Sequence, residues 1–177
     1  TLSTSLCALA ITLGPIVVFG EPAVAESVVA FETATSRLVR PPENVLPAPK
    51  AEELTAMVEA VRRGMADGAL GVSTGLVYSP ACFARTDEVV ALCATARESG
   101  GIFATHMRSE GDGLLEAIAE VIEVAERARI PLQISHLKTS GPRNWEMLDR
   151  AIALIDGARA RGLDVTCDRY PYTAANT

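Results

Sequence analysis

Aromatic residues, histidines and clusters of positive charge are scarce in this chain of 177 residues. Aromatics make up 5% of it, there are 2 histidines, and the formal net charge is -6. An acidic chain without a stripe of Lys and Arg lacks the electrostatic footprint of a nucleic-acid-binding protein, so we expect no nucleic-acid partner. Hydrophobic residues at 49% and charged residues at 21% are ordinary for a soluble globular domain with a sizeable core.

Closely spaced cysteines and long apolar runs are also absent. The cysteines are Cys7, Cys82, Cys93 and Cys167, with no CxxC pair among them. This spacing favours reduced thiols in a cytoplasmic protein over disulfides. The apolar run at residues 6–19 is shorter than the roughly 20 residues of a membrane helix, so we expect no membrane partner.

The same apolar run has two interpretations. Residues 23–25 follow it and have the small-x-small pattern of a signal cleavage site. No positive charge precedes the run, however, and Glu21 and Pro22 lie just ahead of the site. We therefore favour a buried pair of strands for this run.

Four short apolar segments rich in strand-forming residues recur at a nearly constant interval. They are residues 69–73, 101–106, 131–136 and 163–167, whose starts lie 32, 30 and 32 residues apart. The sequence between them has helical periodicity, with helices expected at about 51–66, from an N-cap at Thr86, at 113–129 and at 144–161. Strand and helix alternating every thirty residues or so predict right-handed βαβ units around a parallel sheet.

This repeat is compatible with an open doubly wound sheet or with a closed (β/α)8 barrel. No GxGxxG follows a strand and no GxxxxGK[ST] occurs, which disfavours a nucleotide-binding sheet. Four units are half of a closed barrel, so a barrel would make this chain part of a longer protein. The first residue, Thr1, is not Met, which agrees with that expectation.

Both histidines, His106 and His136, fall at the end of a predicted strand. The C-terminal ends of parallel strands form the active-site face of barrel enzymes. Neighbouring parallel strands lie roughly 4.8 Å apart, so two imidazoles at that level can share one Zn²⁺ ion. A single histidine would more often be structural, but the same position in two consecutive units favours a metal site.

Charged residues follow both histidines. Arg108 and Glu110 could form a pair that supports a bound ligand, which makes Arg108 a candidate substrate-binding residue, although a solvated loop fits equally well. Lys138 lies two residues beyond His136, and strand alternation would put both on one face. A lysine beside a metal ligand suits a substrate carboxylate, and the alternative is a surface lysine.

Three aromatic side chains lie in or next to predicted loops. Tyr78 follows the first strand and Tyr172 follows the last, where a hydroxyl can donate to a developing oxyanion. Each tyrosine taken alone is more often a packing residue. We expect Trp145, at the start of a helix, to be a packing anchor.

Four sequence blocks resemble those of the D-aminoacylase and N-acyl-D-amino-acid deacylase family of the amidohydrolase superfamily, in the family's order and spacing. The blocks are residues 68–84, 100–110, 131–138 and 168–174. The resemblance covers about residues 51–177. It implies an α/β fold, a partial (β/α)8 TIM-type barrel of about four βα units at 51–177, preceded by an irregular, divergent segment at 1–50.

The resemblance also implies a zinc-dependent hydrolase of the amide bond in N-acyl-D-amino acids, which are small-molecule substrates. His106 and His136 resemble two of the family's zinc ligands, and Lys138 resembles the residue that holds the substrate carboxylate. Tyr172 resembles the tyrosine near the scissile carbonyl, and Tyr78 one that lines the substrate pocket. The implied chemistry is polarisation of the carbonyl by zinc.

The chain departs from the family pattern in three ways. It has no early HxH pair, the aspartate that serves as general base would lie beyond Thr177, and Cys7 cannot be aligned with the bridging cysteine. We therefore expect this chain to be weakly active or inactive alone. The alternatives are an amidohydrolase acting on a cyclic amide or dipeptide, or a non-catalytic barrel fragment that self-associates through open sheet edges.

Overall fold

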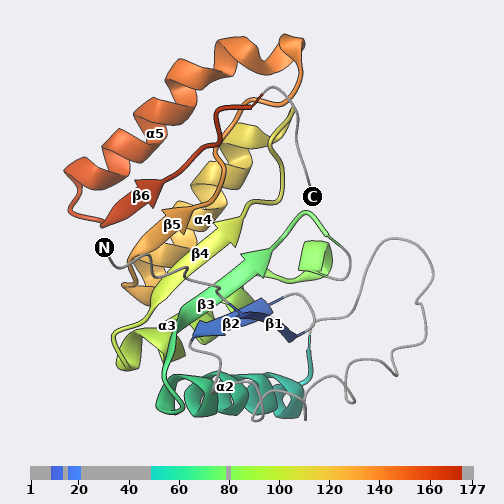
Figure 1. Ribbon diagram of the computed structural model, residues 1–177, viewed down its shortest axis with the longest axis vertical. Coiled ribbons are helices and arrows are strands. Elements are labelled where there is room, and N and C mark those ends of the chain that lie inside the picture. Colours follow the sequence, from blue (N-terminus) through green and yellow to red (C-terminus); the bar gives the residue numbers. More distant parts are fainter. Residues whose placement is uncertain (1–8, 14–15, 21–48, 79–80, 173–177) are drawn as a thin grey trace, which may run out of the picture.

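The residues that the structure describes form one six-stranded sheet covered by helices (Figure 1). The computed structural model describes residues 9–13, 16–20, 49–78 and 81–172. The strands, in spatial and chain order, are β1 (Leu9–Leu13), β2 (Ile16–Gly20), β3 (Ala69–Gly75), β4 (Ile102–His106), β5 (Leu132–Ile134) and β6 (Val165–Cys167). The helices are α2 (Ala51–Ala66), α3 (Thr86–Glu98), α4 (Leu114–Ala128) and α5 (Leu148–Ala160), with 3₁₀ turns η2 (Ala81–Phe83) and η3 (Pro142–Met147).

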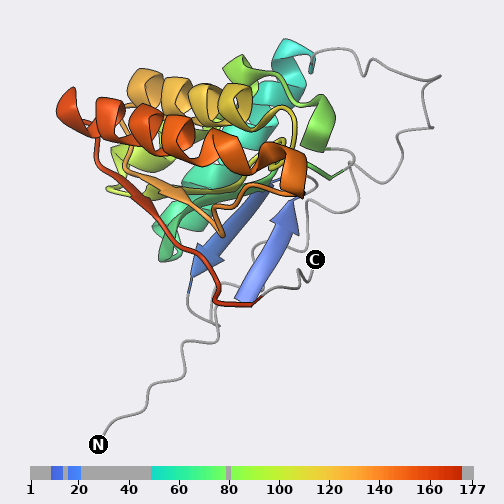
Figure 2. The same cartoon turned by 90° about the horizontal axis from the view of Figure 1, so that it is seen from above.

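Strands β3 to β6 are parallel, and a helix precedes each of them in the chain. Within the described part of the chain, helices α2 to α5 lie on one face of the sheet, where consecutive helices pack side by side (Figure 2). A doubly wound sheet carries helices on both faces, whereas a barrel carries them only on the outside. The arrangement is therefore that of a partial barrel, as expected.

The apolar run near the N-terminus forms the antiparallel pair β1 and β2, and β2 pairs antiparallel with β3. The expected pair of strands is thus confirmed. Residues 23–25, the signal-like sequence, lie outside the described residues, as does most of the segment 1–50. Of the helices that the structure describes, none has the length and apolar character needed to cross a membrane.

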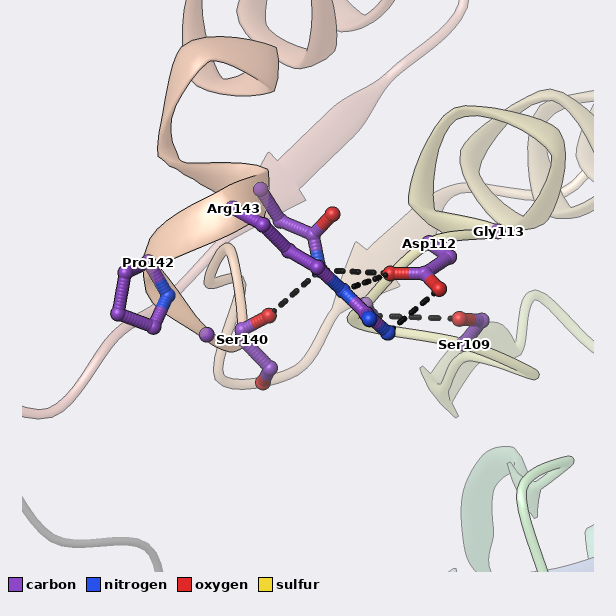
Figure 3. A pocket seen from close by; sticks show the side chains of 9 residues that line it. Ser109, Asp112, Gly113, Ser140, Pro142 and Arg143 are labelled. Carbon is purple, nitrogen blue, oxygen red and sulfur yellow. Dashed lines mark hydrogen bonds and ion pairs between the residues drawn. The ribbon is translucent and has the colours of Figure 1, made fainter.

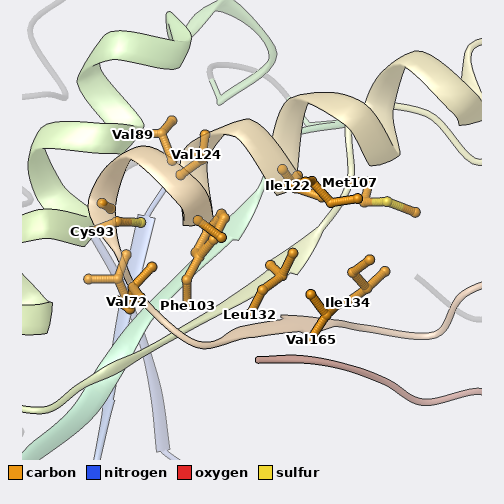
Figure 4. Close-up of a cluster of buried hydrophobic side chains, with 14 of the residues drawn as sticks. Val72, Val89, Cys93, Phe103, Met107, Ile122, Val124, Leu132, Ile134 and Val165 are labelled. Carbon is orange, nitrogen blue, oxygen red and sulfur yellow. The ribbon is translucent and has the colours of Figure 1, made fainter. Parts of the chain in front are cut away.

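The hydrophobic core lies between the sheet and its helices (Figure 4). One row of side chains crosses the four parallel strands in register: Val72, Phe103, Leu132 and Val165. These side chains are at most 3% exposed and belong to the same cluster as the apolar face of α4. Phe103 is the largest residue in the fully buried set.

Two helix predictions need correction. The N-cap of α3 is Arg85 rather than Thr86, whose hydroxyl donates instead to Glu120 Oε1 at 3.1 Å. The expected helix 144–161 divides into the 3₁₀ turn η3, which has a different period, and α5. Trp145, in η3, is 64% exposed, and it is not a packing anchor.

The strand prediction at 131–136 was too long at its end. β5 stops at Ile134, and His136 lies in the following turn with φ 43°, in the left-handed region. β4 does end at His106 as expected. His106 is therefore held by strand backbone, whereas His136 is held by the turn after β5.

Candidate metal centre

The two histidine rings meet at one end of the sheet. His106 ends β4 and His136 follows the neighbouring parallel strand β5. Their ring centroids are 4.3 Å apart with an interplanar angle of 66°, in an edge-to-face arrangement. The convergence predicted from the strand ends is present.

Glu110 brings a carboxylate to this pair of rings. Its Oε1 lies 2.7 Å from His136 Nδ1 and 3.9 Å from His106 Nε2. One donor atom from each of the three residues lies within 4.8 Å of the others, and all three side chains are half-buried. Two imidazole nitrogens and one carboxylate oxygen are a donor set that zinc uses in catalytic sites. We refer to His106, Glu110 and His136 as the metal group.

The surroundings of His106, burial above all, favour the neutral form of its imidazole. Burial, followed by the neighbouring His136, lowers the pKa of His106 below its usual value, although Glu110 acts in the opposite direction. A lowered pKa keeps the imidazole neutral near pH 7, and a metal ion binds only the neutral ring.

Lys138 lies directly against the metal group. Its Nζ donates to Glu110 Oε1 and to the His136 carbonyl oxygen, the latter at 2.8 Å, and it lies 3.0 Å from His136 Nδ1. The same ammonium lies 5.3 Å from the centre of the Tyr170 ring, within the range of a cation–π contact. The predicted proximity of Lys138 to His136 is present, although a turn rather than strand alternation produces it.

Two of the tyrosines, Tyr78 and Tyr170, lie beside residues of the site, and Tyr172 is exposed to solvent. The Tyr78 ring centroid lies 5.1 Å from that of His106, so this tyrosine borders the metal group. Tyr172 is 75% exposed, and Tyr170, which the sequence did not single out, is the tyrosine beside Lys138. Asp168 and Tyr170 are two residues apart, directly after β6. That spacing is a sequence signal that could have indicated Tyr170 as a residue of the site.

Arg108 does not pair with Glu110, so that prediction was wrong. Its Nε and Nη2 donate to the two carboxylate oxygens of Glu120 on α4, at 2.9 and 2.8 Å. Nη1 and Nη2 also donate to the carbonyl oxygens of Cys82 and Ala84, at 2.6 and 3.0 Å. This arginine thus ties the loop after β4 to η2 and α4, and Glu120 raises its pKa further.

We expect Arg108→Gln to lower the free energy of unfolding by about 2–3 kcal/mol, because charged hydrogen bonds and two half-buried carbonyl contacts are lost. Urea unfolding followed by circular dichroism measures it. Arg143→Gln is the matched control, since the Arg143–Asp112 pair is highly exposed and should contribute no more than about 1 kcal/mol. Equal losses in the two variants would show that the Arg108 contacts are not structural.

An open hollow of about 720 Å³ lies between the loops after β4 and β5 (Figure 3). The Arg143 side chain crosses it to Asp112, with Nε 2.8 Å from Oδ1. Ser140, on its rim, donates its backbone N–H to the Glu110 carbonyl oxygen at 2.7 Å. The hollow therefore adjoins the loop that carries one member of the metal group.

No family model matches the chain, but curated relatives and solved structures do. It is 40% identical over 126 residues to a D-aminoacylase of Alcaligenes xylosoxydans xylosoxydans, covering 71% of this chain and 26% of the relative. It is 38% identical over 129 residues to an N-acyl-D-glutamate deacylase of the same organism, covering 73% of this chain and 26% of the relative. The chain thus spans about a quarter of the length of the curated relatives that it matches.

Solved structures agree with these relatives. A D-aminoacylase crystal structure, described as defining a novel subset of amidohydrolases, matches with a TM-score of 0.69 at 36% identity, over 74% of this chain and 27% of that chain. The N-acyl-D-glutamate deacylase of Bordetella bronchiseptica, complexed with zinc and a phosphonate inhibitor, matches with a TM-score of 0.70 at 35% identity, over 73% and 27%. The likeness confirms the partial amidohydrolase barrel, and the relatives that the chain matches are D-aminoacylases and N-acyl-D-amino-acid deacylases.

Proposed function

We propose that this chain carries part of the active site of a zinc-dependent enzyme that hydrolyses the amide bond of N-acyl-D-amino acids. The observation that carries the proposal is the metal group with an ammonium, Lys138, directly against it. The relatives named as deacylases support the substrate class, and one of them was solved with zinc.

The metal group fits zinc by its donors and its spacing. When bound, zinc supplies Lewis acidity that polarises a substrate carbonyl. The role of His106 and His136 is to offer two imidazoles, one from the end of β4 and one from the turn after β5. Glu110 offers a carboxylate that balances positive charge at the site, and in this structure that carboxylate pairs with the Lys138 ammonium and lies beside His136 Nδ1.

We assign the substrate carboxylate to Lys138, because its ammonium lies at the edge of the metal group and is partly accessible. Tyr78 borders the same group and is available to line the substrate pocket. For the tyrosine near the scissile carbonyl we propose Tyr170 in place of Tyr172, since it lies beside Lys138. Arg108 acts in this proposal as a support for the loop rather than as a substrate ligand.

A chimeric enzyme tests the proposal, because this chain spans only a quarter of its relatives. The matched segment of the Alcaligenes D-aminoacylase is replaced by the 126 matched residues of this chain, and hydrolysis of N-acetyl-D-amino acids is measured. We expect hydrolysis that depends on zinc and exceeds that of a cyclic amide. A folded chimera that hydrolyses none of these substrates would favour a non-catalytic segment, and preference for the cyclic amide would favour the other amidohydrolase class.

In the same chimera, we expect Lys138→Met to raise the KM for N-acetyl-D-amino acids by about 10–100-fold, the effect of losing a charged hydrogen bond. The control is the corresponding N-acetyl-D-amino-acid amide, which has no carboxylate, and its KM should not change. Steady-state kinetics with both substrates measure the difference. An equal rise for both would remove Lys138 from carboxylate binding.

We also propose that the chain by itself self-associates through its sheet edges. We propose separately that the protein is cytoplasmic. β1 and β6 are the outer strands of the sheet among the described residues, and exposed edges pair readily with other chains. Cys82, Cys93 and Cys167 are free thiols, which agrees with a reducing compartment. Sedimentation velocity would detect the association as a rise in mass with concentration.

A further inference from the structure

The backbone at His136 is held in a conformation that residues other than glycine seldom adopt. Its φ of 43° lies in the left-handed region, and only Arg129 shares this property among the described non-glycine residues. Arg129 is an ordinary helix end, directly after α4. His136 has no such reason, so neighbouring contacts must hold it.

Asp168, the first residue after β6, supplies those contacts. Its carboxylate Oδ1 accepts the backbone N–H of His136 at 2.7 Å, and Oδ2 accepts the Gln133 side-chain amide at 2.6 Å. Its backbone donates to the Ile134 carbonyl at 3.2 Å and accepts the Leu137 N–H at 2.8 Å. Four hydrogen bonds therefore tie one residue to β5 and to the turn that follows it.

These contacts determine where the His136 ring lies. Among the described residues, the ladder to β6 continues beyond Ile134 through Asp168, and the next N–H to be bonded after Ser135 is that of His136 itself. If that bond is lost, the left-handed residue is free to relax toward an ordinary backbone conformation. The imidazole would then leave its position 2.7 Å from Glu110 and 4.3 Å from the His106 ring.

We propose that Asp168 is the positioning residue of the metal group, acting through the backbone of His136. Asp168 does not contact the metal in this proposal. It fixes the turn so that the imidazole is already directed at Glu110 and His106 before an ion binds. The expected effect of Asp168 on zinc affinity rests on the proposed zinc site. The positioning of the His136 ring is a property of the chain without metal.

The experiment compares Asp168→Ala and Asp168→Asn in the full chain with Asp164→Asn, a control at the other end of β6, where the backbone carbonyl of Asp164 accepts the Leu132 N–H. Asp168 is exposed, so its replacement leaves no cavity, and the variants are expected to fold. The metal-free readout is the pair of imidazole ¹H–¹⁵N signals at one fixed pH. The chain has 2 histidines, and His106→Ala assigns them.

We expect Asp168→Ala to move and broaden the His136 signals while those of His106 change less, and Asp168→Asn to restore part of the wild-type position through its remaining oxygen acceptor. Zinc affinity should fall by about 10–100-fold in Asp168→Ala, the range for residues that orient a metal ligand. Asp164→Asn should change neither readout. Unchanged His136 signals in a folded Asp168→Ala chain would overturn the proposal, as would an equal effect of Asp164→Asn.

The two readouts separate this inference from the proposed function. A shift of the His136 signals in a chain that binds no zinc would uphold the positioning role and reject the zinc site. Tight zinc binding in both wild type and Asp168→Ala, with unmoved His136 signals, would reject the positioning role and leave the zinc site in place.

Discussion

Replacing Phe103 with alanine is expected to lower the free energy of unfolding by about 3–5 kcal/mol. Phe103 is 0% exposed on β4, between Val72 and Leu132 in the register of the parallel strands. Removing its ring leaves a cavity in the row of side chains on which the helices pack. Equilibrium unfolding in urea, followed by circular dichroism, measures the loss.

Phe83→Ala is the matched control for this change. Phe83 is 39% exposed, so the same loss of a ring should cost about 1 kcal/mol or less. Phe103→Leu, which conserves more volume, should lie between the two and keeps the test informative if the alanine variant does not fold. Similar losses for Phe103→Ala and Phe83→Ala would mean that this row is not the centre of the core.

The second large effect concerns zinc affinity. We expect His136→Ala and Glu110→Gln each to weaken zinc binding by about 100-fold or more, because removing a ligand should exceed the 10–100-fold effect of removing a residue that orients one. Competition with a chromophoric chelator measures the dissociation constants. The control, Asp112→Asn, removes an exposed carboxylate from a nearby loop and should leave the affinity within a factor of about two.

A contrary result would be informative for each residue. Wild-type affinity in Glu110→Gln, with loss in His136→Ala, would limit the ligand set to the histidines. Loss of affinity in Asp112→Asn as large as in Glu110→Gln would mean that general negative charge, rather than the metal group, attracts the ion.

The βα units could be predicted from the sequence because their signals are local. Helix α2 begins and ends where expected, with Glu53 near its start accepting the Lys50 N–H and Gly68 just beyond its end. The position of His106 followed directly, since β4 ends at that residue. Amphipathic period and turn residues suffice for such elements.

The end of β5 could not be predicted in the same way. The ladder stops at Ile134 because Asp168, which lies 32 residues further along the chain from His136, takes over the next hydrogen bond. The pairing of Arg108 with Glu120 likewise depends on how the loop after β4 meets α4. Both features arise from contacts between segments that are distant in the sequence. The periodicity of one segment carries no information about such contacts.

The choice between Tyr170 and Tyr172 shows the same limit at the site. Both belong to one short motif, and the resemblance read from the sequence indicated Tyr172 rather than Tyr170. Their surroundings differ in the structure: the Lys138 ammonium lies 5.3 Å from the centre of the Tyr170 ring, whereas Tyr172 is 75% exposed. Glu110 was similarly recognised as charged and close to a histidine, but its place between both rings needed the fold.

The most direct test of the account is a crystal structure of the chain grown with zinc, with anomalous diffraction recorded at the zinc absorption edge. We expect a strong anomalous peak bonded to nitrogens of both His106 and His136, at the roughly 2.0–2.1 Å of zinc–imidazole bonds. A peak bound to only one of these rings, or a zinc-containing crystal in which the two rings point to different sides of the sheet, would contradict it.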